Sequence, residues 1–147
     1  MRTALSTLLF VCFLTGCEVF SFLGSGDRQD HIGTVGEAIE LKIGDRVTIE
    51  EAGLVLTFER LVEDSRCPFD VVCFWEGRGV IRVVLAFGDS RESADLTTHG
   101  FLEGDADHVD RKGYRIRFVE LKPYPASAGS ISHGQYRAVM KVERLEG

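Results

Sequence analysis

Beyond residue 34 the chain alternates apolar and polar positions with a period of two, as expected of β-strands with one buried face. Val47 and Ile49 flank the polar Thr48, and Ile116 and Phe118 flank Arg117 in the same way. Turn-forming Gly, Asp and Ser residues separate such runs. Together they predict about seven strands, at residues 38–43, 45–50, 54–62, 79–87, 94–98, 114–122 and 135–144.

One run differs from the others because it is apolar on both faces. Residues 79–87 are interrupted only by Arg82, which predicts a central strand with neighbours on either side. Residues 43–46 resemble a tight hairpin turn, and 88–91 resemble another. No stretch has a helical period. The pattern therefore predicts an all-β fold, a single small β-sandwich or barrel of about seven antiparallel strands, over residues 34–147.

The amino terminus has a different pattern. Met1 and Arg2 precede an apolar run at 4–14, which is too short to span a bilayer and is typical of a secretory signal. The run ends in Leu14-Thr15-Gly16-Cys17, which resembles the lipobox of bacterial lipoproteins. That resemblance implies that residues 1–16 are removed and Cys17 is lipidated, with 17–33 as a flexible tether. An ordinary secretory signal that contains a cysteine is the alternative.

The lipid anchor implies a location in the bacterial cell envelope. Glu18 follows the lipidated cysteine in place of the Asp of the usual inner-membrane retention signal. In a host with two membranes we therefore expect the outer membrane, with the domain facing the periplasm. Of 17 Lys and Arg residues only Arg2 lies in the signal, so the exported chain keeps 16 against 23 Asp and Glu. This acidic balance disfavours nucleic acid as a partner.

The cysteines are informative once the signal is discounted. Cys12 is lost with the signal and Cys17 carries lipid, which leaves Cys67 and Cys73. In an exported domain such a pair is expected to form a disulfide, worth roughly 2 to 2.5 kcal/mol in the loop-entropy treatment. Zinc ligation would need two further ligands, and a redox role is usually built on C-x-x-C at the start of a helix.

The segment around these cysteines resembles a family of small bacterial secreted proteins and lipoproteins without an established activity. Its pattern is D-S-R-C-P, then C-x-W-x-G and a later L-x-P-x-P, present here at residues 64–68, 73–77 and 121–125. The resemblance implies a shared β-domain with one disulfide, and it brings no substrate or cofactor.

The motif has two interpretations. In the structural one, Asp64 pairs with Arg66 or bonds the loop backbone, Trp75 covers the disulfide, and Gly77 supplies a turn conformation. In the functional one, a stiff loop presents aromatic side chains as a binding surface; the candidates are Phe69, Phe74 and Trp75, with Tyr124 of the stiff, extended 122–125 segment beside them. Burial of Trp75 distinguishes the two interpretations.

Two further patterns suggest chemistry. The segment 103–110 carries the metal-ligand candidates Asp105, Asp107 and Asp110, although it lacks EF-hand spacing and is expected to be a solvated acidic loop. Residues 87–90 together with 105–108 resemble the Ser and Asp-x-x-His blocks of the GDSL hydrolases. Only fourteen residues separate Ser90 from Asp105, and no helices follow, which argues against that fold.

These observations lead to one expectation about function. We expect a membrane-anchored, non-enzymatic envelope module, without a cofactor, that contacts an envelope protein or glycan through its aromatic loop. A lipoprotein that binds calcium or another small ligand is one alternative, and a hydrolase is another.

Overall fold

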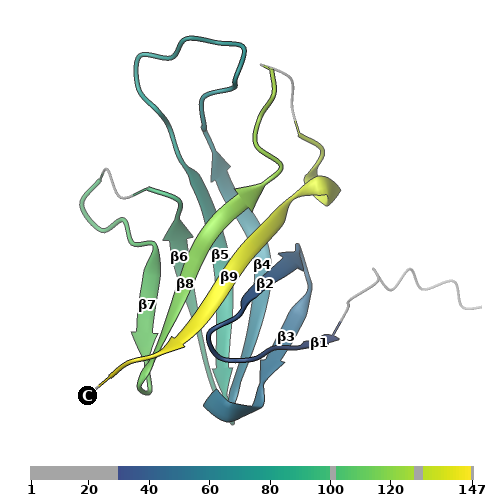
Figure 1. Cartoon of the computed structure of the whole chain (residues 1–147), viewed down its shortest axis with the longest axis vertical. Coiled ribbons are helices and arrows are strands. Elements are labelled where there is room, and N and C mark those ends of the chain that lie inside the picture. Colours follow the sequence, from purple (N-terminus) through teal and green to yellow (C-terminus); the bar gives the residue numbers. More distant parts are fainter. Residues whose placement is uncertain (1–29, 100–101, 128–130, 147) are drawn as a thin grey trace, which may run out of the picture.

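The computed structural model describes residues 30–99, 102–127 and 131–146. The predicted signal, the lipobox with Cys17, and residues 17–29 of the predicted tether lie outside these ranges. The described chain is an all-β sandwich, which confirms the predicted fold class (Figure 1). Its strands are β1 (Asp30–Ile32), β2 (Ala38–Lys42), β3 (Arg46–Ile49), β4 (Leu54–Asp64), β5 (Gly79–Phe87), β6 (Ser90–Thr97), β7 (His108–Arg111), β8 (Tyr114–Lys122) and β9 (Arg137–Arg144).

Two sheets pack face to face. The first has the order β1-β3-β4-β5-β6, and the second has the order β2-β9-β8-β7. Every pair of neighbours is antiparallel except β1 and β3, which are parallel. Two short 3-10 helices lie in the connections, η1 (Glu50–Ala52) and η2 (His133–Gln135). None of the helices in the described residues is long and apolar enough to cross a membrane.

The core lies between the two sheets, and the apolar side chains of the alternating pattern point into it as predicted. Val47 and Ile49 of β3 are fully buried, as are Ile116 of β8 and Met140 of β9. β5 is paired on both edges, which confirms the predicted central strand. The buried hydrophobic cluster comprises Leu41, Val47, Ile49, Leu54, Leu56, Phe58, Ile81, Val83, Leu85, Leu96, Ile116, Phe118, Leu121, Tyr136, Ala138, Met140 and Val142.

The predicted hairpin at residues 43–46 is wrong. β2 belongs to the second sheet and β3 to the first, so the turn passes from one sheet to the other. The turn itself is tight: Gly44 has a φ of +92° and the Asp45 carboxylate accepts a hydrogen bond from the Lys42 amide at 2.9 Å. A local sequence pattern can indicate a turn, but long-range pairing decides which strands lie on either side of it.

The described residues form nine strands where about seven were predicted, because β1 and β7 were not expected, and the start of β6 also differs from prediction. β1 lies inside the predicted tether, so the folded domain includes Asp30–Ile32 and begins before residue 34. β6 begins at Ser90 rather than 94, because its first half lies at a sheet edge and is polar on both sides. β7 (His108–Arg111) occupies the end of the segment expected to be an acidic loop. Such short or polar edge strands carry too few apolar positions to show a period.

Candidate functional site

The loop between β4 and β5 extends beyond the end of the sandwich, beside the segment that follows β8 (Figure 1). Its stem continues the ladder of the two strands: the Ser65 amide donates to the Arg78 carbonyl at 2.8 Å, and the Cys67 amide donates to the Glu76 carbonyl at 3.1 Å. Beyond the stem, Cys67 and Cys73 form the predicted disulfide, with Cα atoms 5.9 Å apart. The loop is therefore closed twice, by backbone bonds and by a covalent bond.

Gly77 has the turn conformation that the motif predicted. Its φ is +67°, and a Cβ at this position would lie 1.8 Å from the Ser65 carbonyl oxygen. Only glycine tolerates both the positive φ and this close approach of the backbone. Gly77 thus lets the chain turn tightly into the stem just before β5.

Arg66 is the centre of a buried polar cluster under the loop. Its side chain is 4% exposed and forms a two-point ion pair with Asp64, from Nε and Nη2 at 2.7 Å each, which confirms the predicted pair. Arg66 also donates to the Leu121 carbonyl at 2.5 Å and to the Pro123 carbonyl at 3.0 Å. One guanidinium therefore joins the base of the loop to the end of β8.

The cluster is completed by Tyr136, whose hydroxyl donates to Asp64 Oδ2 at 3.0 Å. Burial alone raises the pKa of the Asp64 carboxyl, but the hydrogen bonds and charge of Arg66 and the bond from Tyr136 hold that pKa below its ordinary value. Burial and the bond to Asp64 raise the pKa of Tyr136 to about 12. Asp64 is therefore ionised and Tyr136 protonated at neutral pH, as the geometry requires.

Above this cluster the loop exposes apolar side chains. Val72 is 99% exposed, Phe74 93%, Phe69 78% and Trp75 76%. Trp75 is not a buried cover for the disulfide, so that part of the structural interpretation is wrong. Together with the less exposed Val71 and Tyr124, these residues form a surface that we call the aromatic tip: Phe69, Val71, Val72, Phe74, Trp75 and Tyr124.

The aromatic tip is held by contacts between its own members and by the cluster below. The rings of Phe69 and Tyr124 lie 4.5 Å apart, and the Phe69 amide donates to the Pro125 carbonyl at 3.2 Å. The guanidinium of Arg66 lies 5.3 Å from the centre of the Tyr124 ring. Phe74 and Trp75 pack edge to face at 5.1 Å. The structure thus brings the four sequence-predicted aromatic residues to one end of the sandwich.

The three acidic metal-ligand candidates do not converge. Asp105 pairs with Arg78 through two oxygens at 2.6 and 2.7 Å, and Asp107 pairs with Arg117 and with His108. Asp110 accepts two bonds from Arg115, which lower the pKa of the Asp110 carboxyl. In the described ranges no group of three or more His, Cys, Asp or Glu side chains is placed to hold a metal ion.

The hydrolase-like blocks are also separated. Ser90 begins β6, whereas Ala106 accepts a hydrogen bond from the Thr97 amide at the other end of that strand. The seven residue steps between Ser90 and Thr97 correspond to roughly 23 Å. Asp105 and His108, one and two residues from Ala106 in the chain, therefore lie far from the serine hydroxyl.

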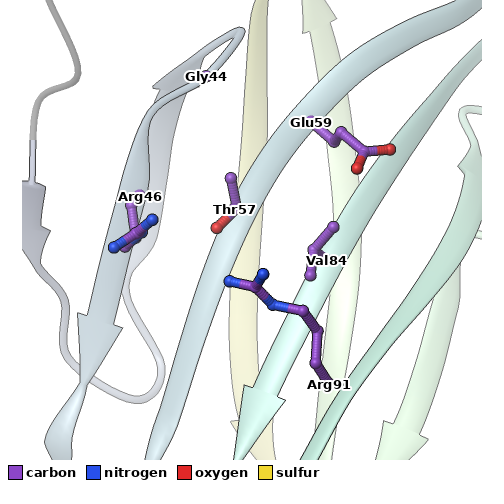
Figure 2. Close-up of a pocket in the computed structure, with 6 residues that line it drawn as sticks. All are labelled: Gly44, Arg46, Thr57, Glu59, Val84 and Arg91. Atoms are coloured by element: carbon purple, nitrogen blue, oxygen red, sulfur yellow. The ribbon is translucent and has the colours of Figure 1, made fainter.

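Sequence reasoning missed a depression of about 240 Å³ on the outer face of the first sheet (Figure 2). Arg91 extends from β6 toward Thr57, and Arg46 lies on the other side of that threonine. Glu59 also lines the depression, and Asp30 is the cross-strand neighbour of Arg46. The lining itself therefore carries two cationic side chains, Arg46 and Arg91, and one anionic side chain, Glu59.

Sequence reasoning also missed the two carbonyl partners of Arg66, at Leu121 and Pro123, and the exposure of Val71 and Val72. The two valines could have been noticed as apolar residues inside a small disulfide ring, where no strand partner can cover them. The contacts of Arg66 with Leu121 and Pro123 join positions 55 and 57 residues apart in the chain, which no local pattern indicates.

In the comparisons with protein-family models, curated proteins and solved structures, nothing matches this chain.

Proposed function

We propose that this chain is a lipid-anchored lipoprotein of the bacterial envelope whose β-sandwich is a non-enzymatic binding module, with the aromatic tip as its contact surface. In a host with two membranes it is attached to the outer membrane and faces the periplasm. The lipid is carried by Cys17, at the end of the lipobox-like Leu14-Thr15-Gly16-Cys17. The exposure of Phe69, Val72, Phe74 and Trp75 on one braced loop is the observation that carries the proposal.

Exposing several large apolar side chains to water is unfavourable, and folding alone does not require it. Large exposed apolar patches on soluble proteins usually mark a surface that contacts something else. The disulfide, the Gly77 turn and the Arg66 cluster stiffen the loop, so less conformational entropy is lost when it binds. Aromatic side chains are also the residues that contribute most to interface hot spots. A stiff loop that presents several of them is suited to binding rather than to chemistry.

Lipidation is tested by Cys17→Ser. The variant should lose its lipid and leave the detergent phase when a cell extract is partitioned, because each buried methylene contributes about 0.8 kcal/mol to membrane attachment. Unchanged partitioning would contradict the lipoprotein assignment.

The contact surface is tested by photo-crosslinking in living cells, with the photoreactive residue placed at position 74 of the full-length chain. Position 32 is the matched control, because Ile32 is also highly exposed, at 84%, but lies on β1. We expect adducts to an envelope component from position 74 well above those from position 32, and fewer of them when Trp75→Ala is added. Equal yields from the two positions would mean that the aromatic tip is not the contact surface.

A further inference from the structure

We propose that the aromatic tip inserts into the interfacial layer of the phospholipid membrane to which the chain is anchored, so that the domain has a second membrane attachment besides its lipid. This inference rests on the proposed function, because it names the contact of the same surface. It is carried by the shape and composition of the aromatic tip and by the length of chain before Asp30.

The loop that carries most of the aromatic tip extends from one end of the sandwich (Figure 1). Val72 and Phe74 are almost fully exposed, at 99% and 93%, so their neighbours cover very little of them. A protein partner would need a groove matched to this projecting surface. A bilayer interface needs no such complementarity, because lipid chains rearrange around an inserted side chain.

The composition of the aromatic tip suits the interface more than the hydrocarbon core. Trp75 and Tyr124 each combine an apolar ring with a polar group, and such residues are enriched at the membrane–water boundary. The backbone there is partly satisfied within the protein, since the Val71 amide donates to the Pro68 carbonyl and the Phe69 amide to that of Pro125. Shallow insertion, roughly 5–10 Å into the headgroup boundary, leaves the remaining backbone groups hydrated.

Charge indicates which lipids the aromatic tip prefers. Both cations of this loop are paired: Arg66 is buried against Asp64, and Arg78 pairs with Glu63 and Asp105. Asp70 and Glu76 are exposed. There is thus no exposed basic side chain between Cys67 and Glu76 to attract anionic headgroups. We therefore expect apolar insertion into zwitterionic membranes that is insensitive to salt.

The tether is long enough for both attachments to reach one membrane. Twelve residues separate Cys17 from Asp30, and the thirteen steps between the two positions span at most roughly 45 Å. Asp30 is level with Thr57 through their common neighbour Arg46, and the chain continues ten residues from Thr57 along β4 and the stem to Cys67, roughly 33 Å. An anchor at Cys17 can therefore lie in the same leaflet as the aromatic tip. The two attachments together would keep the end of the sandwich that carries the aromatic tip pointed at the membrane.

Trp75 is the only tryptophan of the chain, so its fluorescence reports directly on the aromatic tip. The test uses the chain from residue 17 onward with Cys17→Ser, folded under oxidising conditions, and vesicles of phosphatidylcholine and phosphatidylethanolamine. We expect vesicles to shift the Trp75 emission to the blue, to protect it from acrylamide, and to carry the protein upward in a flotation gradient. The effect should persist in roughly 1 M salt, where the Debye length is about 3 Å.

Two variants keep the fluorescent reporter and separate the aromatic tip from the rest of the surface. Phe74→Ser should weaken partitioning about tenfold, equivalent to roughly 1.4 kcal/mol, whereas Ile32→Ser, which removes an exposed side chain far from the tip, should leave partitioning unchanged. Absence of any shift or flotation for the folded parent would overturn the inference, and so would binding that requires anionic lipid and disappears in salt. If vesicles fail but position 74 still crosslinks to a protein or glycan in cells, only the membrane inference fails; if both fail, the proposed function fails too.

Discussion

Replacing Arg66 by Met is the sharpest test of how the loop is held. The substitution removes the guanidinium but keeps an unbranched apolar side chain in a site where Arg66 is 4% and Asp64 8% exposed. The Asp64 carboxylate would then be buried without its cation, and the Leu121 and Pro123 carbonyls would lose their donor. Breaking a buried pair from one side costs about 3–5 kcal/mol.

The matched control is Arg82→Met. Arg82 and Asp95 form an equally close two-point pair, with both bonds at 2.6 Å, but their side chains are 35% and 40% exposed. An exposed pair of this kind contributes about 0.2–1 kcal/mol. The Tm and the free energy of unfolding of both variants are measured by thermal and urea denaturation. For a domain of about 120 residues, the Arg66 substitution should lower Tm by roughly 12–20 °C and the control by at most about 4 °C. Equal losses would refute the assignment of Arg66 as the buried brace.

The pH dependence gives a second check with a definite sign. The pKa of Asp64 is lowered in the folded protein, so the pair stabilises the fold at pH values above the ordinary Asp pKa of about 3.9. This contribution is lost as the pH falls through the lower pKa of the folded state. In Arg66→Met the Asp64 carboxyl is buried without its cation, so protonation of Asp64 removes the unpaired buried charge and stabilises the folded variant. The difference in stability between parent and variant should therefore narrow in acid, and a difference that is constant from pH 7 to about 3 would contradict the reasoning.

Three more substitutions test the loop and its surface. Replacing both Cys67 and Cys73 by Ala should lower the free energy of unfolding by roughly 2 kcal/mol in urea denaturation, and an unchanged midpoint would show that the bond does not brace the fold. Gly77→Ala should cost about 1–3 kcal/mol because of its φ of +67° and the Ser65 carbonyl, whereas Gly134→Ala, with nothing within 4 Å of the added Cβ, should be nearly neutral. Trp75→Ala should change stability by no more than about 0.5 kcal/mol, since the side chain is 76% exposed; a large loss in calorimetry would mean that Trp75 is a packing residue.

Much of the candidate site could be predicted from the sequence because its chemistry is local. Cys67 and Cys73 are six residues apart and form the disulfide that the sequence predicted, and Asp64 and Arg66 are close enough in the chain to pair across one turn. Of the two interpretations of the motif, the one in which Trp75 covers the disulfide was wrong, because the exposure of a side chain depends on what the rest of the fold brings near it. Here the segment that follows β8 contacts Phe69 through Tyr124 and Pro125, and Trp75 remains 76% exposed.

The sequence by itself determined the all-β class and the side chains that face the core, because the period of two follows from the geometry of a single strand. It also determined the disulfide and the turn at Gly77. Only the tertiary structure decided that β2 and β3 belong to different sheets, that β1 joins the fold, and that Arg66 connects the loop to Leu121 and Pro123. These features depend on backbone pairing and on contacts between residues far apart in the chain, which leave no period in the sequence.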